Sequence, residues 1–435
     1  MTDVSDKDFD PNTKQVNGPI NVVRMEGKIN GINKVIYLFM DQHLQAQTQC
    51  DNVFSVDINT YFANTFHKLN KSNKMYDFFL EINPTQLIDP INQSNQSSQL
   101  PKQPPAPAPI KSNYRNIYIF EVMRLFKRIF KYEPNSDKVS ISKYFRKVRL
   151  HYMDIRDYFH TYVFVELYEV MHILYHIQSM NKIFKGQLDQ LLNFLKRFRS
   201  HCQMIKTEME SMKKNPIKPD NKILIGHLKH DISQEEKDKM SVENIRYILY
   251  KSFYRYNHKD VQKKMIVQMG RLISELVELS NQCDDIINIL TNIGYFVIID
   301  DNVLTKINDE ISYGTDHLLP KMIFSIAESF RSLNNNFVKF FARFMDVYFI
   351  RRFLDKEYIT NAITYTGSVH SMLYIEILSK NFGFKVTNYY WSLIKDLDDL
   401  NREIVKLNFE ELQEIFYPPV RAQCSDLTSF PDNFE

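Results

Sequence analysis

The sequence predicts an α/β protein in which a mainly parallel sheet, built from both ends of the chain, is interrupted by a large all-helical, coiled-coil-like insertion. A short apolar run near each end, at residues 35–39 and 362–367, leads into a histidine, His43 or His370. Strands that are covered on both faces are almost wholly apolar, so these runs indicate strands of a parallel sheet. Between them, apolar residues recur at alternating spacings of three and four, which predicts long packed helices.

The length of the chain favours more than one structural unit. One hydrophobic core is seldom large enough for 435 residues, so we expect two units or one domain with a large insertion. Residues 83–113 are rich in Pro, Gln, Ser and Asn and predict a disordered loop, because they bury too little apolar surface. The expected order is a flexible N-terminus (1–20), the first part of the α/β domain (21–158), the helical insertion (159–340), the second part of the α/β domain (341–410) and a tail (411–435).

The first part of the predicted domain contains a strand, a helix and a second strand. The strands are expected at residues 35–39 and 76–81, and apolar residues between them have helical spacing. Such a unit implies a right-handed parallel crossover. It places Glu81 at the same edge of the sheet as Asp41 and His43.

The centre of the chain carries two heptad seams. Residues 163–212 predict one very long helix, and residues 265–290 predict a second. The two seams can bury each other in an antiparallel arm, although periodicity alone leaves open that these helices wrap the sheet. Beyond them, a strand near residues 384–387 should complete another β-α-β step, and the polar tail after Pro418 should be loose.

Charge and motifs disfavour several classes of protein. The net charge of +3, from 55 basic and 52 acidic residues, argues against broad nucleic-acid binding. The chain has no GxGxxG or GxxxxGK[ST] motif, so the usual nucleotide-phosphate loops are not predicted. A local basic surface for nucleic acid is the weakest alternative, through Lys127, Arg128, Lys131, Arg146 and Lys147.

The four cysteines have no paired spacing typical of a zinc site or a disulfide framework. The N-terminus lacks the apolar core of a signal peptide, and no stretch reaches the roughly 18 apolar residues of a membrane span. We therefore expect an intracellular protein of a reducing compartment, with no membrane partner.

Several ionisable residues follow the predicted strands, where the carboxyl ends of a parallel sheet border a ligand crevice. A histidine there can act as a general base, a carboxylate can fix its tautomer, and an arginine can stabilise an oxyanion. Equally, His43, Glu81 and His370 could hold a divalent metal that activates water. The alternative for each histidine is a purely structural hydrogen bond. The candidate catalytic residues are Asp41, His43, Glu81, Arg149, His151, Asp154, Arg156 and His370.

Three short motifs resemble those of the erythromycin esterase, ChaN-like and TraB/Tiki superfamily: Met40-Asp-Gln-His43, Leu80-Glu81 and Gly367-Ser-Val-His370. The resemblance implies a hydrolase, esterase-like or metallohydrolase-like, that acts on an unknown small molecule or peptide. His43 and His370 would match the two family histidines, and Asp41 and Glu81 the carboxylates. The family arginine would be Arg149 or Arg156.

The pattern, including the segments 149–156 and 363–370, also resembles uncharacterised proteins of giant DNA viruses. This resemblance implies a location in the host cytoplasm or the virion. It also supports an alternative function, in which a catalytically inactive, virion-associated protein uses the helical arm to bind a protein partner.

Overall fold

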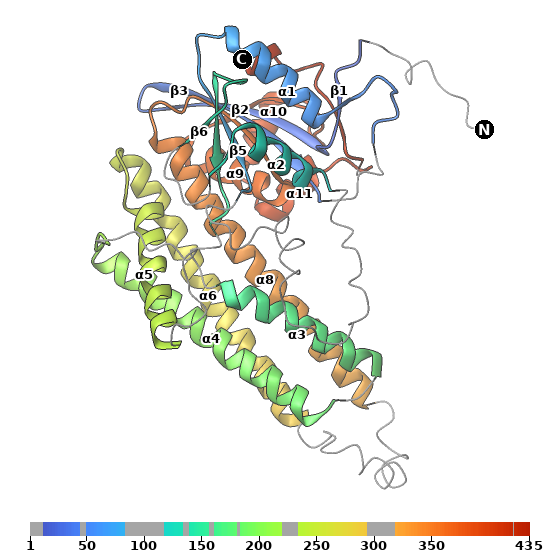
Figure 1. Ribbon diagram of the computed structural model, residues 1–435, viewed down its shortest axis with the longest axis vertical. Helices are drawn as coiled ribbons and strands as arrows, with labels where there is room; N and C mark the ends of the chain where they lie inside the picture. Colours follow the sequence, from blue (N-terminus) through green and yellow to red (C-terminus); the bar gives the residue numbers. More distant parts are fainter. Residues whose placement is uncertain are drawn as a thin grey trace, which may run out of the picture. The chain divides into compact units, whose positions relative to one another are not determined.

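The computed structural model describes residues 12–43, 49–82, 117–133, 139–155, 161–180, 183–219, 234–293, 318–420 and 422–435. The chain divides into two compact units, drawn with the sheet and with the long helices, respectively, in Figure 1. The first unit combines the chain up to Ile155 with the chain from Met345 onward, and the second comprises residues 156–344. The loop predicted at residues 83–113 lies outside the described residues.

The main sheet of the first unit has the strand order β6-β7-β5-β8-β3-β2-β9. Its four central strands, β7, β5, β8 and β3, are parallel, whereas the β6-β7, β3-β2 and β2-β9 pairings are antiparallel. The sheet is therefore mixed rather than mainly parallel. β9 pairs antiparallel with β2, which is itself antiparallel to β3, so β9 runs in the same direction as β8 and completes the expected β-α-β step within the sheet. The strands are β2 (Asn21–Ile29), β3 (Ile32–Asp41), β5 (Tyr76–Leu80), β6 (Ser140–Ile141), β7 (Val148–Tyr152), β8 (Asn361–Gly367) and β9 (Lys385–Tyr389).

A tight hairpin joins β2 to β3 and accounts for part of this difference. Its two turn residues, Asn30 and Gly31, have φ values of 48° and 84°. An Asn-Gly pair suits such a turn because both positions need the left-handed region. This dipeptide is the sequence signal that would have predicted β2.

Helices cover both faces of the main sheet. Because successive side chains of a strand point to opposite faces, Phe78 packs against Phe62 and Phe126, while Phe79 packs against Phe349. The first face is thus covered by α1 and α2, and the second by the last part of α8 together with α9. These helices are α1 (Ile58–Lys68), α2 (Tyr118–Ile129), α8 (Leu318–Asp355) and α9 (Ser368–Phe382).

The two ends of the chain meet in a small second sheet of order β10-β1-β4. Residues 1–11 of the expected flexible N-terminus lie outside the described residues, whereas Val16 of its remaining part is buried on β1. The expected loose tail is instead packed, because Leu427, Phe430 and Phe434 are buried. The tail also contains α11 (Phe409–Phe416), preceded by α10 (Leu397–Ile404), and ends in the 3-10 helix η8 (Asp432–Phe434). The strands of the small sheet are β1 (Gln15–Asn17), β4 (Val56–Asp57) and β10 (Cys424–Asp426).

Cys50 and Cys424 form a disulfide across this small sheet, with their Cα atoms 4.9 Å apart. The expectation that the cysteines form no disulfide was therefore wrong. The two residues are separated by 374 positions in the chain. Spacing along the sequence could not reveal a pair that only the pairing of β1 with β10 brings together.

The second unit is built from long helices. The expected single helix over residues 163–212 is instead two helices, α3 and α4, because the chain is extended at Phe184 (φ −92°, ψ 151°). The Phe184 backbone N–H donates to the Gln187 side chain over 3.0 Å, which caps the start of α4. The helices are α3 (Thr161–Met180), α4 (Lys185–Lys214), α5 (Gln234–Phe253) and α6 (Lys259–Ile293).

The second heptad seam lies on α6 as predicted. Its members are all buried, and α6 packs against α4. Arg199 of α4 and Asp284 of α6 form an ion pair of 3.0 Å beside the buried thiols of Cys202 and Cys283. The buried seam residues of α4 and α6 therefore pack against each other.

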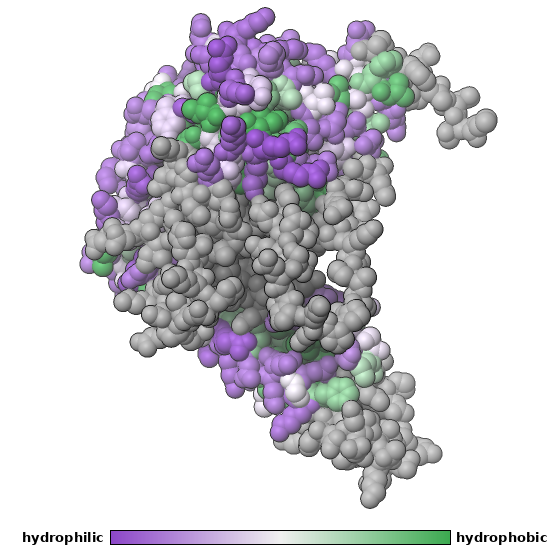
Figure 2. Space-filling view, viewed as in Figure 1, coloured by the Kyte–Doolittle hydropathy of each residue, from purple (hydrophilic) through white to green (hydrophobic). Residues whose placement is uncertain are grey.

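The described surface is largely hydrophilic in the view of Figure 2, with smaller apolar areas. Over the residues that the structure describes, we find no helix that combines the length and the apolar character needed to cross a membrane.

Candidate functional site

The pairing of the central strands brings the two ends of the chain to one edge of the main sheet. β3 and β8 are parallel, and Asp41 at the end of β3 lies opposite Gly367 at the end of β8. β5 lies on the other side of β8 and ends one residue before Glu81. The carboxyl ends of three adjacent strands thus deliver His43, Glu81 and His370 to the same edge.

The first histidine is held by a buried aspartate. His43 Nδ1 lies 2.7 Å from Asp41 Oδ1, and the His43 backbone N–H donates to the same oxygen over 2.6 Å. The Tyr365 hydroxyl donates to the other oxygen, Asp41 Oδ2, over 2.7 Å. A carboxylate only accepts hydrogen bonds, so Nδ1 carries the proton and Nε2 presents its lone pair. The Asp41 side chain is fully buried, whereas that of His43 is 48% exposed.

His43 also has an unusual backbone conformation, with φ at 54°. Residues other than glycine rarely occupy this region, at a cost on the order of 1 kcal/mol or more. The two hydrogen bonds to Asp41 Oδ1 offset that cost and fix the imidazole at the end of β3. Backbone strain of this kind is often found at functional sites.

The second histidine has the same arrangement. His370 lies in the first turn of α9, and its Nδ1 is 2.7 Å from Oδ1 of Asp346, a buried residue of α8. The sequence alone favours a packing or solvated role for Asp346, which stands in an otherwise apolar stretch of helix. A single carboxylate in such a stretch is the signal that could have identified it, because an unpaired buried carboxylate is costly.

Glu81 and Gly367 connect the two dyads, Asp41–His43 and Asp346–His370. The Gly367 N–H donates to Glu81 Oε1 over 2.7 Å, and the same oxygen lies 3.7 Å from His370 Nε2. A Cβ atom on Gly367 would lie 3.3 Å from His43 Nε2 and 3.5 Å from His370 Cδ2. Both imidazoles therefore border the space next to Gly367.

The charges of the carboxylates act on the first dyad. Burial lowers the pKa of His43, but the hydrogen bond to Asp41 and the charges of Glu81 and Asp41 outweigh it, so the pKa is raised above the ordinary value. Burial has the opposite effect on a tyrosine, because it disfavours the anion, and it raises the pKa of the Tyr365 hydroxyl well above its usual range. Tyr365 therefore remains protonated and able to donate to Asp41.

His43, Glu81 and His370 are also the residues expected to hold a divalent metal. Within the described parts of the chain, no group of three or more His, Cys, Asp or Glu side chains has an arrangement suited to a metal ion. Nδ1 of each histidine is already bonded to an aspartate. An aspartate on Nδ1 leaves Nε2 of each imidazole as the nitrogen that can exchange a proton or bind a ligand.

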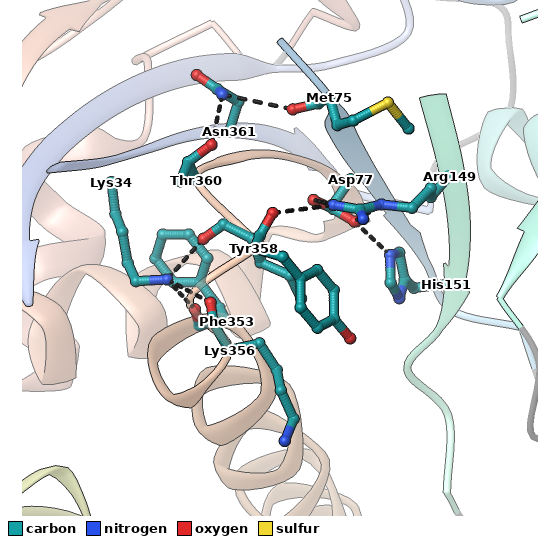
Figure 3. Close-up of polar contacts among 11 residues, drawn as sticks. Lys34, Met75, Asp77, Arg149, His151, Phe353, Lys356, Tyr358, Thr360 and Asn361 are labelled. Carbon is teal, nitrogen blue, oxygen red and sulfur yellow. Dashed lines mark hydrogen bonds and ion pairs between the residues drawn. The ribbon is translucent and has the colours of Figure 1, made fainter. Parts of the chain in front are cut away.

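The structure places Arg149 and His151 in a separate cluster around Asp77 (Figure 3). Both residues lie on β7 and point to Asp77, which accepts two hydrogen bonds of 2.7 Å from Arg149 and lies 2.6 Å from His151 Nε2. Asp77 is four residues before Glu81 along the direction of β5, and four residues of a strand span roughly 13 Å at about 3.3 Å per residue. Asp77 and Arg149 thus lie near the amino ends of β5 and β7, and His151, which pairs with Phe79, reaches back to Asp77.

Of the remaining two candidates, Asp154 lies in the described part of the chain, just after β7. Asp154 is buried, and its backbone N–H donates to the Ile82 carbonyl over 3.3 Å. Arg156 lies outside the described residues. The strand character of β7, with Val148, Leu150 and Tyr152 alternating with Arg149 and His151, is a period-2 signal that the prediction of a charged cluster overlooked.

We expect the buried cluster to make stability depend on pH. Burial, and then the charge of Arg352, lower the pKa of His151 to about 4, although Asp77 acts in the opposite direction. The folded pKa is below the unfolded value of about 6.5, so the contribution of neutral His151 is present above about pH 6.5 and is lost as the pH falls through the folded pKa. The total loss should be on the order of 3 kcal/mol, since each pKa unit corresponds to about 1.4 kcal/mol.

Urea unfolding at a series of pH values would measure this effect. The His151→Phe variant keeps a ring that can stack on Phe79, as His151 does at a centroid distance of 4.5 Å. Its free energy of unfolding should fall less steeply with acidification than that of the wild type. Equal slopes for the two proteins would contradict the assignment to His151.

Comparisons with known proteins place the chain in a viral group. It is 37% identical to the uncharacterized protein R706 of Acanthamoeba polyphaga mimivirus over 438 residues, which cover 99% of both chains. It is 33% identical to each of the mimivirus proteins R160 and R161 over 449 residues, which cover 98% of this chain and 99% of each relative. No solved structure matches the chain.

The expected resemblance to giant-virus proteins is thus confirmed. The resemblance to the erythromycin esterase, ChaN-like and TraB/Tiki superfamily receives no support from these matches. A family model, described as a family of unknown function (DUF5847), matches residues 14–435. The chain therefore belongs to the DUF5847 family.

Proposed function

We propose that the protein is a hydrolase whose two aspartate-oriented histidines act as acid and base at the carboxyl edge of the sheet. The observation that carries this proposal is the pair of dyads, Asp41–His43 and Asp346–His370, each with a 2.7 Å contact to Nδ1. A carboxylate on Nδ1 fixes the tautomer and orientation of an imidazole, as a proton-transfer group requires.

His43 is suited to the role of general base. Its Nδ1 proton is held by Asp41, so Nε2 can take a proton from an attacking water. Its side chain is 48% exposed, which allows water and substrate to reach it. Because the pKa of His43 is raised, the neutral, basic form is populated only as the pH rises through that pKa, and the hydrolytic rate should rise with it.

His370 is suited to return a proton to the leaving group. It borders the same space beside Gly367 as His43, and its side chain is 13% exposed. Protonated His370 would be stabilised by Asp346 on Nδ1 and by the negative charge of Glu81 near Nε2. An acid and a base bordering one small space is the arrangement that hydrolysis by an activated water needs.

The start of α9 offers a replacement for the expected arginine. The first N–H groups of a helix have no partner within the helix, and the helix dipole favours negative charge there. Gly367 is the N-cap of α9 and has no side chain to cap these groups. The amides of Ser368 and Val369 could therefore stabilise an oxyanion that develops beside His370.

The orienting role of Asp41 can be tested before any substrate is identified. The Asp41→Asn variant should lower the pKa of His43, because it removes a negative charge and replaces the acceptor of the Nδ1 proton. Histidine titration by NMR would measure this change in pKa, with the His43 signal identified by its loss in the His43→Asn variant. An unchanged His43 titration in a folded Asp41→Asn protein would show that the contact does not govern the imidazole.

Hydrolytic activity itself should be sought with chromogenic carboxylic esters and phosphate esters, with and without a chelator or added divalent metal. The proposal expects turnover of at least one of these substrate classes, and loss of that turnover in Asp346→Asn as well as in Asp41→Asn. Turnover that both variants retain would remove the dyads from the chemistry. A complete lack of turnover would favour the alternative of an inactive interaction protein.

A further inference from the structure

The disulfide between Cys50 and Cys424 lies in the same unit as the two dyads. Both of its cysteines are partly exposed, whereas the free cysteines Cys202 and Cys283 are buried in the helical unit. Burial also raises the pKa of the Cys202 and Cys283 thiols, which suppresses their reactive thiolate form. Among the described cysteines, Cys50 and Cys424 are therefore the two that are accessible to thiol exchange.

Asn17 fastens this disulfide to the small sheet. On β1, Asn17 is the register partner of Cys424 on β10. Its side-chain Oδ1 accepts the Cys50 backbone N–H over 2.8 Å, and its Nδ2 donates to Ser55 Oγ over 2.8 Å. The disulfide and the Asn17 hydrogen bonds thus hold the segment around Cys50 against β1 and β10. Cys50 is seven residues after His43 in the chain.

The residue that follows β1 leads to the first dyad. The Gly18 N–H donates to the Gln423 carbonyl, beside Cys424, over 2.9 Å. A Cβ atom on Gly18 would lie 3.2 Å from the Tyr365 hydroxyl oxygen, and φ of Gly18 is 134°. The Gly18 backbone, directly after β1, therefore packs next to the Tyr365 hydroxyl, which donates to Asp41.

A second backbone contact joins the two sheets close to the same point. The Ile20 N–H donates over 2.9 Å to the carbonyl of Met40, the residue before Asp41. Gly18 and Ile20 thus contact Tyr365 and Met40, which flank Asp41 in space and in sequence. The path from the disulfide to the dyad consists of one β-strand pairing, one glycine contact and one side-chain hydrogen bond.

We infer that the Cys50–Cys424 disulfide is a redox-sensitive support of the Asp41–His43 dyad, with Tyr365 as the positioning residue between them. Reduction by a dithiol breaks the Sγ–Sγ bond. The dithiol supplies two electrons and two protons, Cys50 and Cys424 become thiols, and the dithiol becomes a disulfide. Without the bond, the Cys50 segment loses its covalent link to β10 and keeps the hydrogen bond from the Cys50 N–H to Asn17.

This inference rests on the proposed function only for its effect on turnover. The effect on the dyad is structural and can be measured without a substrate. The oxidised form also removes the basis for expecting a reducing compartment, because stable disulfides are typical of oxidising environments.

The test uses the full chain carrying Cys202→Ala and Cys283→Ala, so that the disulfide is its remaining redox group. Oxidised protein, protein reduced with dithiothreitol, and the Cys50→Ser/Cys424→Ser variant are compared. We expect reduction and the double serine variant to shift the NMR titration of His43 in the same direction, toward that of Asp41→Asn. The Tm should fall by several degrees, because the cross-link no longer restricts the unfolded chain.

A Tyr365→Phe variant locates the effect. It removes the hydroxyl and should shift the His43 titration in oxidised protein, and reduction should then add little further shift. Thiol counting that finds Cys50 and Cys424 unpaired after air oxidation would overturn the inference, as would a His43 titration that reduction leaves unchanged. If the serine variant does not fold, reduction of the folded protein still decides. A shift of His43 without any hydrolysis would support the inference and count against the proposed function.

Discussion

Replacing Asp77 with alanine should lower the free energy of unfolding by about 3–5 kcal/mol, the usual cost of removing one partner of a buried ion pair. Asp77 is fully buried, accepts two hydrogen bonds from the Arg149 guanidinium and contacts His151. Its loss would leave a buried cation without its carboxylate. Urea unfolding monitored by circular dichroism at neutral pH measures the effect.

A surface ion pair provides the matched control. Arg199 and Asp284 are 3.0 Å apart, with side chains that are 54% and 43% exposed. Pairs of this kind contribute about 0–1 kcal/mol, so Asp284→Ala should change stability little. If Asp77→Ala costs no more than Asp284→Ala, the cluster at the amino ends of the strands does not stabilise the sheet.

Replacing either site histidine with alanine should lower kcat/KM for any hydrolysed substrate by about 10²–10⁴-fold, the usual contribution of a positioned acid or base. His43→Ala removes the proposed base, and His370→Ala removes the proposed acid. Neither substitution should unfold the protein, because neither side chain is a member of the buried apolar core. Initial rates on the substrate found by the ester assays would measure both.

His67 on α1 supplies the control for these substitutions. It is exposed and lies in the last turn of the helix. His67→Ala should retain the wild-type rate within a few-fold. A comparable loss in His67→Ala would point to a general effect on folding, and undiminished rates in His43→Ala and His370→Ala would remove both residues from the mechanism.

The core strands of the site were predictable because their signal is local. The apolar runs that became β3, β5 and β8 are almost fully buried, and burial on both faces is what such runs indicate. The strand ends then placed Asp41, Glu81 and His370 at one edge. The heptad seam of α6 was predictable for the same reason, since its period is written in consecutive residues.

The features that escaped prediction depend on partners far away in the chain. Asp346 acquires its role from a contact to His370, 24 residues later, and Tyr365 from a contact to Asp41, 324 residues earlier. The disulfide depends on the pairing of β1 with β10. Local composition carries no record of such neighbours. Asp77, which contacts Arg149 and His151, likewise lies 72 and 74 residues before them in the chain.

Two other differences between the predicted and the observed structure had local sequence signals, but a stronger pattern in the same region indicated another structure. The Asn30-Gly31 turn was outweighed by the interpretation of residues 35–39 as the first strand of a β-α-β unit. The capped start of α4 at Phe184 and Gln187 was outweighed by a heptad pattern that continues through it. In both cases two residues with a specific hydrogen-bonding or φ requirement decided the local structure.

The most direct test of the account is the hydrolytic rate of the double variant His43→Ala/His370→Ala beside the two single variants. Residues that act as one unit give losses that do not add, because removing either one already disables the step. The account predicts that the double variant is no slower than the slower single variant, within a few-fold. Losses that multiply, or a double variant that retains the wild-type rate, would show that His43 and His370 do not form one catalytic site.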